Sequence, residues 1–482
     1  MSSASVNLPI PGNADFAAIL PATVIALGAL VVMFVDLFAR GAGTGRRVVA
    51  VVLAFAALLL AGVFEAQSYG HDVSAFGGAF IAGGFSVVFS EIVIIATIAT
   101  LMLSLGIGRG DQVAGTTALV LWSATGGLLM AGASNLMSVF LGLELLSLAL
   151  YCLCAMSTRR TARESALKYL ILSSVASAVL LYGSAMLFGA TGSVAFADLA
   201  AAPVTPLLAL GAGLFLVGLA FKLALVPFHV WSPDVYEGAP LPVTAFMSVV
   251  TKAGALAVLA RFAYAALPPD RADALLVPLW AVAALSMLVG NLAALAQTDL
   301  KRLLAYSGIA QMGYIVAAFA GLTPLGLRYA VFYLAAYTFM NLGAFAVLAL
   351  MAKDGDAVIG LQRFAGLAYR RPTLAAAMTF FLIGLAGLPP TAGFTGKILI
   401  LAATVGAGYA WLAGVLIAGT AISAYVYFKI VRTMFVRADA AHVRDERPAM
   451  PLPWIAVAVC AAATLALGLV PLTPSNILPH VK

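Results

Sequence analysis

Charged side chains are scarce in this sequence. Asp, Glu, Lys and Arg together make up 9% of the 482 residues, whereas hydrophobic residues make up 63%. A soluble domain carries about 25% charged residues, so the composition excludes a sizeable soluble domain. Apolar stretches long enough to cross a hydrocarbon core about 30 Å thick recur along almost the whole chain. The sequence therefore predicts a single membrane domain, residues 1–482.

Cysteine and histidine are also scarce. Cys152, Cys154 and Cys460 have no metal-ligand spacing, and residues two apart on a helix face different sides, so neither a metal site nor a disulfide is expected. The sequence has no haem, iron–sulfur or flavin pattern, and residues 41–46 lack the spacing and lysine of a phosphate-binding loop. We expect no cofactor and no redox chemistry in this chain. Its first Lys or Arg is Arg40, which does not fit a cleaved signal peptide.

Fourteen apolar spans are present. Their length predicts an all-α polytopic membrane protein of about fourteen transmembrane helices. We place the spans at Phe16–Phe38, Val48–Phe64, Phe85–Ile107, Gly115–Ala133, Leu136–Met156, Ser165–Phe188, Leu207–Phe228, Leu241–Phe262, Leu275–Ala296, Leu303–Gly321, Leu327–Met351, Thr373–Thr404, Trp411–Phe435 and Pro453–Val470.

Lys and Arg are distributed unevenly between the loops that join these spans. Counting each loop together with the span ends that flank it, and with the N-terminus outside, only Arg261, Arg271, Arg328 and Lys482 of the 26 Lys and Arg fall outside, and three lysines lie deep within spans. All the others fall inside, as the positive-inside rule requires. With one span more or fewer, the Lys and Arg would no longer fall mainly on one side of the membrane. The distribution therefore favours fourteen spans with both termini outside, and the net charge of +7 needs no nucleic acid to explain it.

A short sequence that occurs twice in similar form predicts internal repeats. The hexamer Phe215–Ala220 in span 7 resembles Phe381–Ala386 in span 12. The copies are five spans apart and therefore face opposite ways, as in transporters built from inverted repeats. We predict two inverted five-helix repeats, spans 4–8 (residues 115–262) and spans 9–13 (residues 275–435). A chance similarity between apolar hexamers is the alternative.

Three lysines, Lys222, Lys252 and Lys397, lie within spans. A charge at the bilayer centre costs about 2.5–3.5 kcal/mol on insertion scales, so it normally faces a bundle interior and has a partner. Glu144, in the middle of span 5, is the natural carboxylate partner. The proton affinity of a buried lysine responds to its surroundings, which suits a proton relay. The alternatives are snorkelling of Lys222 to the membrane surface and a purely structural role for Glu144.

Prolines interrupt two of the spans. Span 7 contains Pro227, and span 12 contains Pro389 and Pro390. Proline removes a backbone donor, and broken backbone within a membrane is tolerated only where it is buried in protein or lines a water-filled cavity. We therefore predict broken helices 7 and 12.

Two further residues are candidates for a functional role. His229 follows the first break and is either a proton-relaying or a structural histidine. Glu91, near the start of span 3, is either an interface residue or a functional one.

Four segments carry long motifs: Phe140–Leu145 around Glu144, Gly218–Pro240 around Lys222, Asp299–Ser307, and Gly387–Lys397. Together they resemble subunit N of bacterial NADH:quinone oxidoreductase (respiratory complex I), whose mitochondrial counterpart is NADH dehydrogenase subunit 2. The resemblance extends over roughly residues 15 to 470. The related subunit L has a long lateral helix after its last spans, and subunit M typically has Glu where this chain has Lys397.

The resemblance implies a role for each buried charge. Glu144 and Lys222 would form a charge pair that modulates a proton channel, Lys252 would be the central relay, and Lys397 would deliver protons towards the outside. The chain would thus be a proton-translocating translocase subunit without a redox centre. NADH, FMN, iron–sulfur clusters and quinone would bind to partner subunits, with subunits M and K and the lateral helix of subunit L as neighbours. The location would be the bacterial plasma (inner) membrane, with both termini on the periplasmic side.

Two other functions fit parts of the pattern. A cation/proton antiporter of the Mrp type would use the same buried charges but would be driven by an ion gradient, with no redox partner. A structural membrane scaffold would tolerate removal of the buried charges.

Overall fold

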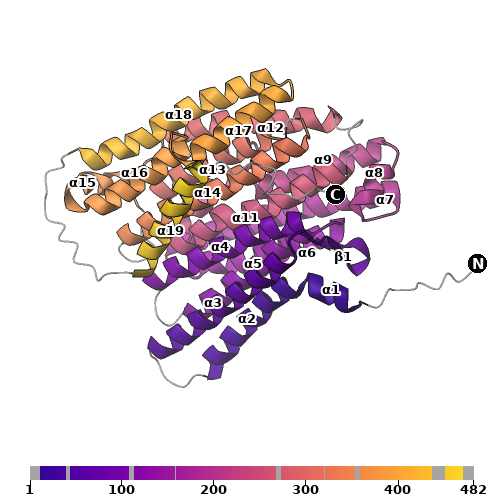
Figure 1. Ribbon diagram of the computed structural model, residues 1–482, viewed down its shortest axis with the longest axis horizontal. Helices are drawn as coiled ribbons and strands as arrows, with labels where there is room; N and C mark the ends of the chain where they lie inside the picture. Colours follow the sequence, from indigo (N-terminus) through magenta and orange to yellow (C-terminus); the bar gives the residue numbers. More distant parts are fainter. Residues whose placement is uncertain are drawn as a thin grey trace, which may run out of the picture.

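The computed structural model of the chain describes residues 11–38, 44–107, 113–157, 159–266, 273–319, 321–352, 359–436 and 451–469. Figure 1 shows a bundle of helices, in which the first half of the chain, from indigo to magenta, packs beside the second half, from rose to orange. The elements are α1 (Asn13–Ala18), α2 (Leu20–Phe38), α3 (Thr44–Gln67), β1 (Val73–Ala75), η1 (Phe76–Gly78), β2 (Phe80–Ala82), α4 (Gly84–Ile107), α5 (Val113–Gly132), α6 (Leu136–Ala155), α7 (Arg160–Thr191), α8 (Phe196–Ala201), α9 (Pro206–Lys222), α10 (Trp231–Gly238), α11 (Leu241–Arg261), η2 (Phe262–Ala266), α12 (Asp273–Leu295), α13 (Leu300–Ala317), α14 (Pro324–Met351), η4 (Leu361–Phe364), α15 (Leu367–Arg370), α16 (Pro372–Ala386), α17 (Ala392–Gly406), α18 (Ala410–Phe435) and α19 (Pro451–Leu469).

Eleven helices within the described ranges are long and apolar enough to cross a membrane. Three of the predicted spans are not among the eleven. Span 10 corresponds to α13, whose first turn carries Lys301 and Arg302, while spans 7 and 12 correspond to shorter apolar helices next to a break. The predicted all-α architecture of about fourteen membrane helices is therefore confirmed.

Both predicted helix breaks are present. α9 ends at Lys222, and a non-helical turn containing Pro227 leads to α10. α16 ends at Ala386, where Gly387 adopts the left-handed conformation with φ 83° before α17 begins. Glycine tolerates this conformation because it has no Cβ. The breaks matter because the last carbonyls of a helix have no partner within the helix and must be satisfied by other groups.

Polar caps fix the start of the helices that carry the candidate site. The side chain of Asn135 accepts a hydrogen bond from the backbone N–H of Ser138 at the start of α6. Thr205 caps α9 in the same way, and Asp299 caps α13 by accepting from the backbone N–H of Arg302. Such caps satisfy donors that the first turn leaves unpaired. They set where each helix begins and hence the depth of its buried polar residues.

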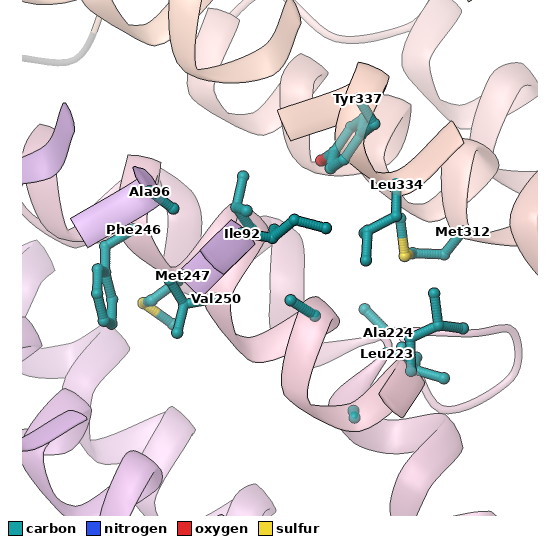
Figure 2. Packing of buried hydrophobic residues seen from close by; sticks show 14 of the residues in the cluster. Ile92, Ala96, Leu223, Ala224, Phe246, Met247, Val250, Met312, Leu334 and Tyr337 are labelled. Atoms are coloured by element: carbon teal, nitrogen blue, oxygen red, sulfur yellow. The ribbon is translucent and has the colours of Figure 1, made fainter. Parts of the chain in front are cut away.

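The interior is packed with apolar side chains around α11, which is buried along its whole length. Residues from α4, α11, α13, α14 and the break after α9 meet there. Figure 2 shows Met247 of α11, Met312 of α13 and Leu334 of α14 among them. Charged or polar groups within this region are therefore surrounded by protein and not by lipid.

Two cations that the charge count assigned to loops are in fact buried. Lys301, in the first turn of α13, is fully buried and donates a hydrogen bond to the carbonyl of Ala239 at 2.9 Å. Arg261 is the last residue of α11, and its guanidinium lies 4.9 Å from the ring centre of Phe85. Both lie next to a span boundary, where position in the sequence does not distinguish a loop from the buried end of a helix. The β1–β2 hairpin between α3 and α4 was not predicted either.

Part of the topology prediction falls outside the described residues. This applies to residues 39–43, 108–112, 267–272, 353–358 and 437–450, which carry seven of the counted Lys and Arg, and to both termini.

Candidate functional site

Lys222 lies in the protein interior at the end of α9. Its Nζ donates hydrogen bonds to Ser147 Oγ of α6 at 2.7 Å and to Tyr169 OH of α7 at 3.0 Å. The amine also lies 5.2 Å from the centre of the Tyr169 ring, within the range of a cation–π interaction. A snorkelling lysine keeps its ammonium in water. Because Lys222 is fully buried and points to neighbouring helices, that alternative is wrong.

Glu144 lies on α6, one turn before Ser147, and is partly buried. Its charge interacts with Lys222 at longer range. Within the described residues, however, no ion pair of 4.0 Å or less joins the two side chains, and Glu144 Oε1 is buried without a hydrogen-bond partner. The structure thus places Ser147, and not Glu144, in direct contact with the amine of Lys222.

Trp231, the first residue of α10, completes the surroundings of Lys222. Its Nε1 donates a hydrogen bond to the carbonyl of Phe221 at 2.8 Å. Its ring stacks on that of Tyr169, with the centroids 4.9 Å apart. Trp231 therefore contacts both the backbone just before Lys222 and the tyrosine that binds the amine.

Lys252 lies in the middle of α11 and is fully buried. Its Nζ donates a hydrogen bond to Tyr337 OH of α14 at 3.2 Å, and this hydroxyl donates to the carbonyl of Ser248 at 3.3 Å. Gly308 of α13 faces the same amine. A Cβ atom built on Gly308 would lie 2.4 Å from Lys252 Nζ and 3.0 Å from Tyr337 OH. The missing side chain at position 308 therefore leaves the space in which the amine lies.

Lys397 lies in the second turn of α17 and faces the end of the other half of the broken helix. Its Nζ donates hydrogen bonds to the carbonyls of Leu385 and Ala386, each at 3.1 Å, and lies 4.7 Å from the ring centre of Tyr314. The carbonyls at a helix C-terminus lack intrahelical partners and carry partial negative charge. The break between α16 and α17 thus supplies a binding site for a buried cation.

Neutral polar side chains that the sequence analysis missed lie next to Lys397. Gln311 of α13 is fully buried, and its Nε2 donates to the carbonyl of Leu385 at 3.1 Å, which also accepts from Lys397. The same amide donates to Tyr427 OH at 3.3 Å, and Gln311 Oε1 accepts from Tyr333 OH. A glutamine inside an apolar helix is the sequence signal that could have revealed this group.

The same group extends towards Lys252. Tyr427 OH is hydrogen-bonded to Ser307 Oγ on α13. Ser307 directly precedes Gly308, the residue that faces the Lys252 amine. We call Ser307, Gln311, Tyr333 and Tyr427 the Gln311 cluster. It connects the neighbourhood of Lys252 to the carbonyl that binds Lys397.

The region between Lys222 and Lys252 differs. Over the described part of the chain, no hydrogen bond links the partners of Lys222 to those of Lys252. Figure 2 shows Leu334 and Met312 between Tyr337 and the residues Leu223 and Ala224 of the break after α9. The gap is not purely apolar, because Tyr236 of α10 interacts electrostatically with both Tyr169 and Tyr337. The Gln311 cluster shares the carbonyl of Leu385 with Lys397, but it approaches Lys252 only through the adjacent residues Ser307 and Gly308.

His229 and Glu91 lie apart from the contacts of the three lysines. His229 follows the break after α9; its Nδ1 is buried without a hydrogen-bond partner, and its ring centre lies 6.4 Å from that of Tyr306. Glu91 of α4 lines a cavity of 310 Å³ whose other walls come mainly from apolar residues of α4 and α14. Neither residue forms a hydrogen bond with a buried lysine in the described ranges.

Comparison with known proteins places the chain in a family. The family described as NADH:quinone oxidoreductase/Mrp antiporter, TM, matches residues 133–423. NADH-quinone oxidoreductase subunit N 1 of Symbiobacterium thermophilum is 42% identical over 490 residues, covering 97% of this chain and 99% of the relative. A chain of respiratory complex I from Thermus thermophilus has a TM-score of 0.81 and 35% identity, over 95% of this chain and 99% of that one.

The same fold is found in a second kind of complex. A chain of the Mrp complex from Dietzia sp. has a TM-score of 0.82 over 94% of both chains, but its identity of 23% shows the likeness of fold alone. The long, full-coverage similarity to subunit N, together with the four motifs and the buried lysines of the broken helices, shows that this chain belongs to the family of NADH-quinone oxidoreductase subunit N.

Proposed function

We propose that this chain translocates protons as a membrane subunit of an NADH:quinone oxidoreductase. The observation that carries the proposal is the set of three lysines, Lys222, Lys252 and Lys397, each at most 4% exposed. No carboxylate lies within 4.0 Å of any of their amines in the described structure. An ammonium without a counter-ion is costly inside a membrane protein and by default marks a functional site. A purely structural role does not account for three of them.

In the proposed relay, a proton moves from Lys222 to Lys252 and then to Lys397. Glu144 modulates the first step through its charge, because it is close enough to act on Lys222 without binding it. The second step uses the Gln311 cluster, whose hydroxyls and amide either pass the proton or orient water that does. In the described structure no hydrogen bond joins the partners of Lys222 to those of Lys252, so the first step requires water to enter between them.

The energy for transport comes from outside this chain. Moving one charge across 100 mV costs about 2.3 kcal/mol, and the sequence has no redox motif of its own. We propose that NADH, FMN, iron–sulfur clusters and quinone bind to partner subunits, with subunits M and K and the lateral helix of subunit L as neighbours. Electron transfer there changes the surroundings of Glu144 and Lys222, and the proton affinity of the pair changes with them.

The arrangement in the membrane is part of the proposal. Residues 115–262 and 275–435 form two inverted repeats, each of which contains one helix break. The chain lies in the bacterial inner membrane with both termini on the periplasmic side, and His229 brings protons to the relay from the opposite, α10 end. Cysteine labelling at residues 159–163 tests the orientation: modification by an impermeant reagent added from the periplasmic side would contradict it.

The relay is tested by Lys222→Ala and Lys222→Arg, with Lys429→Ala as the control. Lys429 is a partly buried lysine whose Nζ donates to the carbonyl of Leu295, which is not a partner of any relay residue. Alanine removes the titratable amine, and arginine keeps a charge but is effectively always protonated. We expect both Lys222 variants to assemble and to impair proton uptake driven by NADH in inverted membrane vesicles, while the control pumps normally.

Two results would contradict the relay. Normal pumping by Lys222→Arg would mean that Lys222 acts as a fixed charge, and normal pumping by Lys222→Ala would leave only a structural role.

The second candidate is a cation/proton antiporter of the Mrp type, because the fold is shared with a chain of an Mrp complex. Cation exchange by vesicles that contain this chain, without any NADH oxidation, would favour it over the complex I function.

A further inference from the structure

We infer that Asp234 is a positioning residue that holds the surroundings of Lys222 to the second half of the chain. The inference rests on the proposed role of Lys222 as a proton carrier. It concerns an ion network at the α10 end of the bundle that none of the relay steps uses.

Asp234 of α10 lies between helices from the two halves of the chain. Its Oδ2 accepts a hydrogen bond from Lys168 Nζ of α7 at 3.0 Å, and its Oδ1 accepts one from Arg302 Nη1 of α13 at 2.6 Å. Arg302 also donates to Glu237 Oε2 of α10 at 3.1 Å. One carboxylate thus links α7, α10 and α13, and a second ties α10 to α13 again.

The network is charged at neutral pH. Burial by itself disfavours the charged carboxylate, but hydrogen bonds from Arg302 and Lys168 outweigh it and hold the pKa of Asp234 below its usual range. Because the pKa in the folded protein is lowered, the ion pairs persist at neutral pH and are lost only when the pH falls through that lowered value. Single ion pairs that are this exposed contribute little to stability. We therefore infer that the network serves to fix the relative positions of α7, α10 and α13.

A short chain of contacts leads from this network to Lys222. Asp234 lies one turn after Trp231 on α10, and Lys168 directly precedes Tyr169 on α7. Trp231 stacks on Tyr169 and donates to the carbonyl of Phe221, next to Lys222. Tyr169 OH accepts from the Lys222 amine. The link between Asp234 and Lys168 therefore fixes how the Trp231 and Tyr169 rings meet.

The close approach of α10 to α7 supports this rigidity. At the far end of α10, a Cβ atom built on Gly238 would lie 2.0 Å from Ser165 Oγ of α7. A substituted residue would not fit there, so α10 lies against α7 along its length. A displacement of α10 therefore moves the stacked rings together with it.

The other side of the network faces the second half of the relay. Arg302 lies in the first turn of α13, and the same helix carries Gly308 and Gln311 further along. A shift of α13 relative to α7 pulls on Asp234 through Arg302 and alters the Trp231–Tyr169 contact. The network thus couples the hydrogen bonding of Lys222 to the position of the helix that lines the Lys252 and Lys397 sites.

The test uses the assembled complex in inverted membrane vesicles and measures protons taken up per NADH oxidised. The variant is Asp234→Asn. The matched control is Glu164→Gln, because Glu164 also binds Lys168 at 3.0 Å but lies on the same helix and bridges nothing. We expect Asp234→Asn to lower the ratio by about threefold, in the range of coupling networks, and Glu164→Gln to leave it unchanged. Asp234→Glu should restore most of the ratio.

A second readout separates positioning from a general structural defect. If Asp234 acts through Tyr169, then adding Asp234→Asn to Tyr169→Phe should lower the ratio no further than Tyr169→Phe alone. If the double variant lowers the ratio by the product of the two single effects, the inference is overturned. Normal pumping by Asp234→Asn would also overturn it. If Asp234→Asn fails to assemble, Arg302→Gln replaces it. This variant removes only the ion pairs between α10 and α13, and it is likewise compared alone and combined with Tyr169→Phe.

The Lys222 variants keep the two proposals apart. Impaired pumping by Lys222→Ala together with normal pumping by Asp234→Asn refutes only the positioning role. Normal pumping by Lys222→Ala refutes the relay itself.

Discussion

Substitution of Gly308 by alanine tests the relay at its centre. The added methyl group would lie 2.4 Å from Lys252 Nζ and 3.0 Å from Tyr337 OH. To reach an ordinary contact distance, the amine must retreat by about 1 Å. Its hydrogen bond to Tyr337 is already 3.2 Å long, at the upper limit of N–H···O bonds, so the movement should break it.

The fold should tolerate this change better than the relay does. The displaced atom is the end of a flexible side chain, and loss of a hydrogen bond to a charged group costs about 1.5–3 kcal/mol. Alanine in a helix interior offsets about 1 kcal/mol of this relative to glycine. Misplacing a reacting group by 1 Å, in contrast, can slow a step by about a hundredfold. We therefore expect Gly308→Ala to assemble but to pump protons at least about tenfold more slowly.

The assay is NADH-driven proton uptake by inverted membrane vesicles, with the amount of assembled complex measured in parallel. Gly414→Ala on α18 is the control, since a Cβ atom built there has no neighbour within 4 Å. If Gly308→Ala pumps as fast as Gly414→Ala, the exact position of the Lys252 amine does not limit transfer, and the reasoning is refuted.

Two further substitutions probe the exit side of the relay. Gln311→Leu should lower the protons pumped per NADH and, by leaving buried partners unsatisfied, destabilise the subunit by about 1–3 kcal/mol. Thermal inactivation of the complex measures the destabilisation. The control Gln297→Leu, near the end of α12, should change neither the pumping ratio nor the stability. Lys397→Met should abolish pumping while the complex still assembles, whereas Lys429→Met should pump normally; pumping by Lys397→Met at the rate of that control would remove Lys397 from the relay.

Local signals in the sequence were sufficient for most of the fold. Apolar length located the membrane helices, and proline located the two breaks, because both effects act within one segment of chain. The three buried lysines stood out for the same reason, since an isolated charge inside an apolar span is rare.

Contacts between helices could not be predicted in this way. The sequence suggested Glu144 as the direct partner of Lys222, whereas Ser147, one turn away on the same helix, occupies that place. Tyr427 and Gln311 went unnoticed because neutral polar side chains carry no charge signal. Lys301 was assigned to a loop, although the fold buries it against Ala239. Each of these depends on which helix faces which, and hydropathy along one span does not contain that information.

The two carbonyls that bind Lys397 have a consequence for the proposed relay. An ammonium group has three N–H bonds, and Leu385 and Ala386 accept two of them. The neutral amine left after deprotonation still has two N–H bonds, so it can keep both carbonyl contacts. Lys397 can therefore change its charge without changing its place. In the proposed relay, Lys397 would therefore exchange only its third proton while its side chain stays in place.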